Sequence, residues 1–170
     1  IGVGPNQDPG KLDEATRRGL IRAAADGRKL LQEVIASGDL GKRVNNWNIP
    51  PKDMGRAGLA DDFLLRGSLQ CMGGIIANDP AEAVYMNTTK DANGQTLDGT
   101  KRYTMRFAPG QLPQVNAFWS ITMYDSDGFQ AANEIDRFAI GDRDALRFNA
   151  DGSLDIYMQH ENPGGDKTAN

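Results

Sequence analysis

The stretch of residues 117–124, AFWSITMY, constrains the fold of this 170-residue chain more than any other segment. Successive side chains of a β-strand point to opposite faces, so Trp119, Ile121 and Met123 would share one face. The opposite face would carry Phe118, Ser120, Thr122 and Tyr124. Because neither face carries a charge, we expect other parts of the protein to cover both. The pattern predicts a central core strand of an antiparallel β-sandwich.

Alternating apolar and polar residues predict further strands after residue 80. A first strand is expected at residues 81–88, and residues 102–107 place apolar side chains on one face and polar side chains on the other. Residues 136–140 predict a short strand, and residues 147–159 predict a hairpin. Several strands separated by turns indicate a β-sandwich of the jelly-roll type.

The residues before this β region predict helices. Apolar residues recur at steps of three and four over residues 13–37, which indicates an amphipathic helix with Gly38 as its stop. A second helix is expected at residues 62–77, buried on more than one side. Between the two helices, residues 39–60 are expected to form an ordered connector that Trp47 anchors.

These elements divide the chain into three parts. Residues 1–79 are expected to form a helical lead-in and connector, and residues 80–162 a β-sandwich domain. Residues 163–170 are rich in glycine and are expected to form a frayed tail. The fold class is therefore predicted to be mainly β with N-terminal helices.

The composition excludes several classes of partner and site. With 19 basic and 23 acidic residues, a net charge of −4, the chain has no basic surface for nucleic acid or anionic membrane. The hydrophobic residues 63–77 fall short of the ~20 residues of a membrane-spanning helix. Cys71 is the one cysteine, so no intrachain disulfide can form, and we expect a buried, inert thiol. The start at Ile1, without a signal-peptide pattern, indicates a processed or internal fragment.

The residue types give little support to metal or serine chemistry. A zinc site needs three or four Cys, His or carboxylate ligands, and the chain has one cysteine and one histidine, His160. We therefore expect neither a metal nor another cofactor. Asp125-x-Asp127-Gly128 offers alternating oxygen ligands for calcium, but turn geometry explains these residues without an ion. A serine hydrolase would need His160 as its base, and the sequence has no Gly-x-Ser-x-Gly motif.

The chain offers one candidate set for binding a ligand, near the aromatic strand: Arg137, Asn133, Arg106, Tyr124 and Asp127. An arginine half-buried on a sheet needs a partner and can bind a carboxylate or a phosphate. The alternative is a structural arginine bonded to loop carbonyls or to Asp127 or Asp136. The aromatic residues Tyr103, Trp119 and Tyr124 could line a ligand groove, although aromatic residues at strand spacing more often belong to a core.

A pair of carboxylates would indicate a different function, that of a hydrolase or lyase. Such a pair acts as acid and base when the two groups lie roughly 5 to 10 Å apart across a cleft. The candidates are Glu134, Asp136, Asp125 and Asp155. Ordinary exposure explains them as well, because a chain with 23 acidic residues brings some acids together without any function.

Several short motifs together resemble the bacterial family known as domain of unknown function 1214, over residues 80–162. They are Tyr103 to Phe107, Leu112-Pro113, Phe118-Trp119-Ser120 with Tyr124, Asn133 with Arg137, and Asn149 to Ser153. The stretch with Asn46-Trp47 and Arg66 resembles the connector that precedes this domain in proteins that also carry a domain of unknown function 1254. The resemblance implies a jelly-roll-like fold, a companion N-terminal β domain, a chain that continues past Asn170, and association with exported or envelope proteins.

The function expected from these observations is that of a non-catalytic ligand-binding or assembly module of a two-domain, envelope-associated bacterial protein. Loss of the companion domain would leave an apolar face that favours homo-oligomers. The resemblance places the protein in the periplasm or cell envelope. The alternative is a hydrolase or lyase that uses carboxylates and Arg137, and a third interpretation is a purely structural oligomer.

Overall fold

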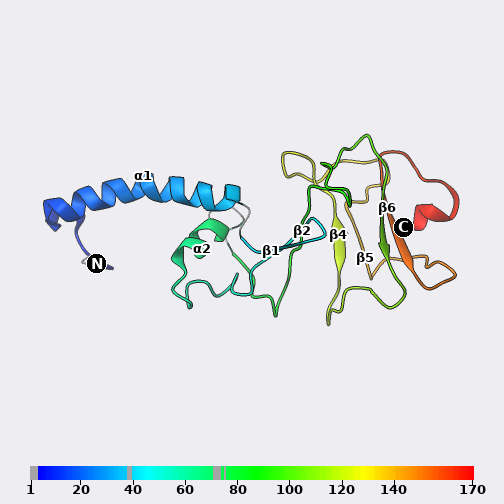
Figure 1. Ribbon diagram of the computed structural model, residues 1–170, viewed down its shortest axis with the longest axis horizontal. Helices are drawn as coiled ribbons and strands as arrows, with labels where there is room; N and C mark the ends of the chain where they lie inside the picture. Colours follow the sequence, from blue (N-terminus) through cyan, green and yellow to red (C-terminus); the bar gives the residue numbers. More distant parts are fainter. Residues whose placement is uncertain (1–3, 38–39, 71–73, 75) are drawn as a thin grey trace. The chain divides into compact units, whose positions relative to one another are not determined.

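The computed structural model describes residues 4–37, 40–70, 74 and 76–170. The chain divides into two compact units, Ile1–Thr96 and Leu97–Asn170, each described by itself (Figure 1). Within the described residues, the fold consists of short strands in small antiparallel sheets together with one main helix. No helix among these residues has the length and hydropathy to cross a membrane.

The main helix of the first unit is α1, Glu14–Ser37, which agrees with the helix predicted over residues 13–37. A short 3-10 helix, η1 (Pro9–Lys11), precedes it. Asp13 accepts hydrogen bonds from the Thr16 backbone N–H (2.9 Å) and hydroxyl (2.5 Å). These bonds stabilise the carboxylate and lower the pKa of Asp13. Gly38, the predicted stop, lies outside the described residues.

The second helix, α2, covers Phe63–Ser68, and Leu69 and Gln70 continue it as a π-helical turn. Asp62 caps its start by accepting a hydrogen bond of 2.9 Å from the Leu65 N–H. The prediction of a helix to residue 77 was wrong, because Gly74 and residues 76–79 are not helical. Gly74 has φ +148°, outside the helical range, and glycine is a poor residue for a helix interior. Cys71, expected to be a buried thiol, lies outside the described residues.

A hairpin that the sequence did not predict occupies the connector. Strands β1 (Lys42–Val44) and β2 (Trp47–Ile49) pair antiparallel. Asn45 and Asn46 join them with φ of 49° and 67°, a left-handed conformation that asparagine tolerates. Residues 81–88 were predicted to form a strand, but none of the strands β1 to β6 includes them. One bridge, Asn48 to Asn87, pairs this segment with β2, so it lacks the partner that a regular strand needs.

Four strands form two pairs in the second unit. β3 (Tyr103–Phe107) pairs antiparallel with β6 (Leu154–Met158), and β4 (Ser120–Thr122) pairs with β5 (Ala139–Gly141). The prediction for β3 is confirmed, since its apolar side chains are half-buried and its polar side chains exposed. At Gly141 a Cβ atom would lie 2.1 Å from the Trp119 carbonyl oxygen, so the close approach of β5 to β4 requires glycine.

Both strand pairs contribute to one apolar core. Its buried residues are Trp119, Ile140, Leu154 and Ile156, with Met105, Phe107, Leu112, Ile121 and Leu146 packed against them. The Phe107 and Trp119 rings lie 5.6 Å apart between centroids. Burial of these side chains is the main source of stability in the unit.

The central strand predicted at residues 117–124 is covered on one face only. β4 is three residues long, and Trp119 is 9% exposed. On the opposite face, Phe118 and Tyr124 are 54% and 61% exposed. The expectation that both faces are covered was therefore wrong for Phe118 and Tyr124, whose side chains are more than half exposed.

The C-terminal residues are ordered by specific contacts. Residues 163–170 were expected to fray, but Gly165–Ala169 form a 3-10 helix, η3. Asn170 is buried, and its backbone oxygen accepts a hydrogen bond of 3.1 Å from the Tyr157 N–H. The tail thereby attaches to β6.

Candidate functional site

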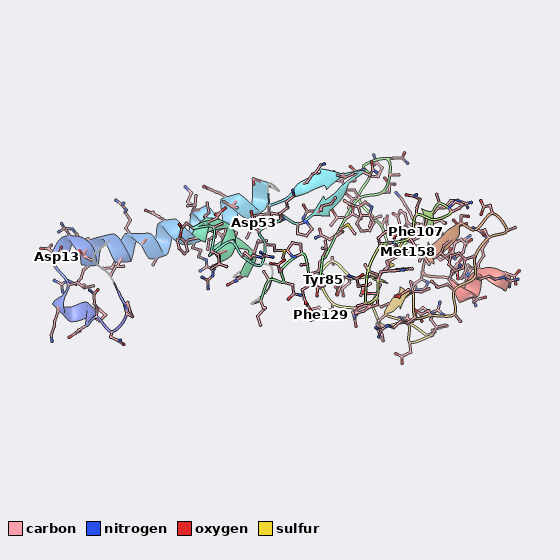
Figure 2. All side chains as sticks on the ribbon, turned by 90° about the horizontal axis from the view of Figure 1, so that it is seen from below. Asp13, Asp53, Tyr85, Phe107, Phe129 and Met158 are labelled. Atoms are coloured by element: carbon pink, nitrogen blue, oxygen red, sulfur yellow. The ribbon has the colours of Figure 1, made fainter. Side chains whose placement is uncertain are left out.

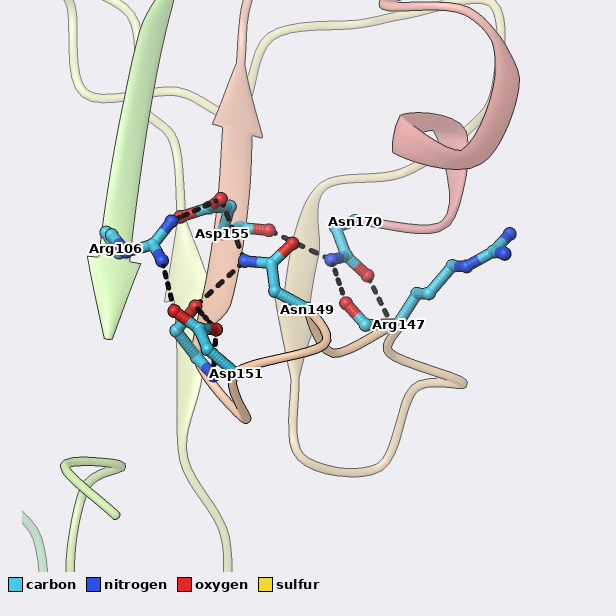
Figure 3. A network of polar contacts seen from close by, with 7 residues as sticks. Arg106, Arg147, Asn149, Asp151, Asp155 and Asn170 are labelled. Atoms are coloured by element: carbon cyan, nitrogen blue, oxygen red, sulfur yellow. Dashed lines mark hydrogen bonds and ion pairs between the residues drawn. The ribbon is translucent and has the colours of Figure 1, made fainter. Parts of the chain in front are cut away.

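The most connected polar cluster of the second unit is centred on Arg106 of β3 (Figure 3). The strand register places Arg106 directly opposite Asp155 of β6. Arg106 Nη1 donates to both carboxylate oxygens of Asp155, at 3.2 and 3.0 Å. Its Nη2 donates to Asp151 Oδ2 at 2.9 Å. One guanidinium therefore binds two carboxylates. We call Arg106, Asp151, Asp155 and Asn149 together the Arg106 network.

The turn before β6 positions both acids. Gly152 has φ +80°, which the tight bend requires and glycine allows. Asp151 Oδ1 accepts hydrogen bonds from the Ser153 hydroxyl (2.5 Å) and backbone N–H (3.0 Å). These bonds and the nearby Arg106 guanidinium lower the pKa of Asp151. Asn149 Nδ2 donates to Ser153 Oγ at 2.9 Å and to Asp155 Oδ2 at 3.0 Å.

Asn170 extends this cluster to the end of the chain. Its side-chain amide donates to the carbonyl oxygens of Arg147 (2.7 Å) and Asp155 (2.9 Å), and accepts from the Arg147 N–H (2.7 Å). Both sides of the amide group are therefore used. Asn170 fixes the loop at residue 147 against β6, next to the Arg106 network (Figure 3).

The exposure of these groups determines what they can do. The Arg106 side chain is 52% exposed, whereas that of Asp155 is 14% exposed. Asp155 is thus a largely buried carboxylate. Its negative charge is stabilised by the ion pair with Arg106 and by the hydrogen bond from Asn149. Since Arg106 already contacts two carboxylates, it is not available as a site for a further anion. The arrangement is that of a structural ion pair.

Arg137 has a separate environment. Asn133 Oδ1 accepts from the Arg137 N–H (3.0 Å), and Asn133 Nδ2 donates to the Arg137 carbonyl (2.9 Å), so Asn133 closes a short loop. Arg137 Nη1 donates to the Thr168 carbonyl at 3.3 Å. The two arginines of the predicted set therefore bind different partners. The Arg137 guanidinium bonds to the carbonyl of Thr168 in η3 rather than to a loop carbonyl. Arg106 pairs with Asp151 and Asp155 rather than with Asp127 or Asp136.

The other two predicted residues lie on a tight turn. Tyr124 forms an isolated bridge with Gln130. Asp125 Oδ1 accepts from the N–H groups of Asp127 and Phe129, each at 2.9 Å. Turn geometry thus accounts for the aspartates at this position. In the part of the chain that the structure describes, no group of three His, Cys, Asp or Glu side chains is arranged to hold a metal ion.

Sequence reasoning missed the roles of Asp151, Asn149 and Asn170. The Asn149 to Ser153 turn contributes to the family resemblance, but its contacts with Arg106 were not predicted. The sequence did carry a signal for Asp151. This residue lies in the turn that leads into β6, so it comes close to a basic side chain on the strand that pairs with β6. Nothing in the sequence indicated Asn170, because its contacts depend on how the tail folds back.

Large apolar side chains are exposed on the segments around β4. Their exposed fractions are Phe118 54%, Met123 48%, Tyr124 61%, Phe129 71% and Ile135 67%. In Figure 2, Phe129 lies apart from Phe107, which packs on the core. The Arg143 guanidinium lies 4.9 Å from the centroid of the Phe118 ring, a cation–π contact. We call these five side chains the β4 apolar set.

Comparison with known proteins gives two findings. A family model described as Protein of unknown function (DUF1214) matches residues 82–170. The crystal structure of the VPA0106 protein from Vibrio parahaemolyticus is similar over 99% of this chain, with 29% sequence identity and a TM-score of 0.66. The chain spans only 39% of that protein's length. No curated protein matches the chain.

Proposed function

The chain belongs to the DUF1214 family of proteins of unknown function, and from this premise we propose that it is a non-catalytic assembly module of a larger, envelope-associated protein. The observation that carries the proposal is the exposure of the β4 apolar set. Monomeric soluble proteins rarely expose large contiguous apolar surface unless it binds something. The occupant proposed here is a companion N-terminal β domain of the same protein.

The length of the related structure supports the same proposal. The chain covers 39% of the VPA0106 protein, so at least one relative carries much more polypeptide than this module. A companion domain packed on Phe118 and Tyr124 of the β4 apolar set would cover the second face of β4. That contact would complete a β-sandwich of the jelly-roll type, with the core on one side of β4 and the companion on the other. Location in the periplasm or cell envelope is part of the proposal and derives from the family resemblance.

A ligand-binding role is proposed for Arg137 rather than for Arg106. Among the described residues, no carboxylate forms an ion pair with Arg137, and its guanidinium donates to one carbonyl oxygen. An arginine with remaining donors can bind a carboxylate or phosphate in two-point geometry. Tyr124 and Asp127 remain candidate neighbours of such a ligand.

The hydrolase or lyase alternative draws less support from the same residues. Acid–base catalysis needs a carboxyl group that can hold and release a proton near neutral pH. The pKa of Asp151 is lowered, so this group stays ionised. Asp151 and Asp155 share one guanidinium, which suits a structural ion pair better than a proton donor.

Hydrogen exchange tests the assembly proposal. Amide exchange would be measured over residues 118–135 in this chain and in a longer polypeptide that includes the companion domain. We expect exchange at least about tenfold slower in the longer polypeptide, because a docked domain protects the segment from local opening. The β3 and β6 amides serve as the internal control and should change little. Equal exchange of residues 118–135 in both polypeptides would refute docking on the β4 apolar set.

A further inference from the structure

A small hollow lies at the end of the β3–β6 pair that is farther from the Arg106 network. The strand register ends there with Tyr103 opposite Met158, and the segments that continue from both strands line the hollow. Its volume of about 340 Å³ is at the lower end of the range for sites that hold small molecules. The lining residues all belong to the second unit: Gly99, Thr100, Lys101, Arg102, His160 and Glu161. We call this space the β3–β6 hollow.

Basic side chains predominate in the β3–β6 hollow. Three of its six lining residues are basic and one is acidic, in a chain whose net charge is −4. Lys101 and Arg102 come from the segment before β3, and His160 comes from the segment after β6. Lysine and arginine are cationic donors, and an imidazole ring carries at least one N–H donor in either protonation state. Two segments that are distant in sequence thus bring together groups that suit an anion.

Most of these donors are available to a ligand. Within the residues that the structure describes, the Lys101 ammonium and the His160 ring form no hydrogen bond or ion pair. Arg102 Nη2 and Glu161 Oε2 lie 2.5 Å apart, and this is the single contact of the Arg102 guanidinium with a described residue. Both side chains of that pair are 70% exposed, so the pair contributes little and exchanges readily with solvent. Glu161 is therefore an occupant that a more highly charged anion can displace.

A second acid, Asp98, is held outside the hollow. Its Oδ1 accepts hydrogen bonds from the Thr100 N–H (2.9 Å) and hydroxyl (2.8 Å). These bonds, together with the positive charge of Lys101, lower the pKa of Asp98, so this carboxylate stays ionised. Asp98 is absent from the lining of the hollow and forms no ion pair with Lys101 among the described residues. The Lys101 ammonium therefore keeps its donors for a ligand.

We propose that the β3–β6 hollow binds a small soluble phosphate monoester. A phosphate group carries nearly two negative charges and three strong acceptor oxygens, which match the three basic side chains. Arg102 binds it in two-point geometry in place of Glu161, Lys101 adds a charge and His160 donates an N–H. The net charge of −4 opposes attachment to an anionic lipid surface, which favours a soluble ligand. Because the basic side chains are exposed, binding is weak, with a Kd on the order of 10 mM.

Glu161 and the phosphate group compete for Arg102, so removing the acid and removing a base have opposite effects. An exposed ion pair changes an equilibrium constant by a factor of about 1.4 to 5. Glu161→Gln should therefore bind phosphate about two- to fivefold more tightly, and Lys101→Gln about two- to fivefold more weakly. This site does not depend on the companion domain or on the ligand role of Arg137, because the hollow contains neither Arg137 nor a member of the β4 apolar set.

His160 gives a direct readout, because it is the only histidine of the chain and lines the hollow. Its ring signals would be followed by NMR during addition of inorganic phosphate and, separately, of glycerol 3-phosphate. The pH and the ionic strength are held constant, with chloride as the balancing anion. We expect a saturable shift with both phosphates.

Two matched variants control for the total charge of the chain. Lys90→Gln removes one positive charge and Glu134→Gln one negative charge, both outside the hollow. We expect each of them to leave the binding curve unchanged, whereas Lys101→Gln and Glu161→Gln move it in opposite directions. Urea unfolding followed by tryptophan fluorescence verifies that every variant folds.

Four results would overturn the proposed site. A His160 shift that grows in proportion to phosphate without saturating would show non-specific association. Equal curves for the two lysine variants, or for the two glutamate variants, would show that the hollow does not hold the anion. Weaker binding in Arg137→Gln with no change in Lys101→Gln would assign the phosphate to Arg137. Finally, cosedimentation with vesicles of phosphatidylcholine and phosphatidic acid, without any response to glycerol 3-phosphate, would identify a lipid headgroup as the ligand.

Discussion

Replacing Arg106 with methionine should destabilise the second unit much more than its exposure suggests. The guanidinium is 52% exposed, and a typical exposed ion pair contributes about 0.2–1 kcal/mol. Its partner Asp155, however, has a side chain only 14% exposed and would keep Asn149 as its remaining side-chain partner. Leaving a fully buried charge unpaired costs about 3–5 kcal/mol, so a largely buried one should cost roughly 2 kcal/mol.

Arg102→Met provides the matched control for this change. Arg102 precedes β3 and pairs with Glu161 at 2.5 Å, but both side chains are 70% exposed. The carboxylate left behind remains hydrated, so the free energy of unfolding should fall by no more than about 0.5 kcal/mol. Both variants lose one arginine and gain the same apolar side chain.

Urea unfolding followed by tryptophan fluorescence measures both free energies, because Trp119 lies in the core of the second unit. The experiment would be run at pH 7 in 0.15 M and 1 M salt. We expect Arg106→Met to remain the less stable variant at both salt concentrations, because salt screens exposed pairs more than buried ones. Equal unfolding free energies for the two variants would refute the claim that Asp155 depends on Arg106. Adding Asp155→Leu to Arg106→Met should restore part of the loss, since it removes the unpaired charge.

Two further predictions concern the same unit. The pKa of Asp151 is lowered in the folded state, so its stabilising effect is present above the unfolded pKa of ~3.9 and is lost as the pH falls through the lower, folded value. Urea midpoints between pH 6 and pH 2 should therefore fall less steeply for Asp151→Asn than for the parent chain, and parallel curves would contradict this assignment. Asn170→Ala removes three side-chain hydrogen bonds at a buried position and should lower the free energy of unfolding by about 1–3 kcal/mol. Asn162→Ala replaces an exposed asparagine just before the same tail and should change it by less than about 0.5 kcal/mol, and an equal effect of the two variants would show that the tail does not hold β6.

The sequence predicts well the elements that a pattern within one short run of residues specifies. The start of α1 follows from Asp13 and a regular apolar spacing, and β3 follows from strict alternation over five residues. The failures are those that depend on a distant partner. Residues 81–88 alternate correctly, but a strand needs a neighbour, and only Asn87 forms a bridge.

The candidate site shows the same division. Arg106 and Asp155 were both singled out from the sequence, one as a ligand-binding residue and one as a catalytic acid. Their pairing depends on the β3–β6 register, which joins residues 49 positions apart. Local patterns indicate which residue types are present, whereas sequence-distant pairing decides whether an arginine is available to a ligand or already held by acids.

The burial of Asn170 has a consequence for how the β3–β6 sheet can grow. An asparagine side chain ends in an amide group, which can form the same hydrogen bonds as a backbone peptide group. Here the Asn170 side-chain amide donates to the Asp155 carbonyl, and the Asn170 backbone carbonyl accepts from the Tyr157 N–H. Asn170 thus substitutes for one residue of a neighbouring strand and occupies the edge of β6. The edge of β3 has no second strand beside it among the described residues. Addition of a foreign strand, including the first step of aggregation, should therefore proceed from the β3 side alone.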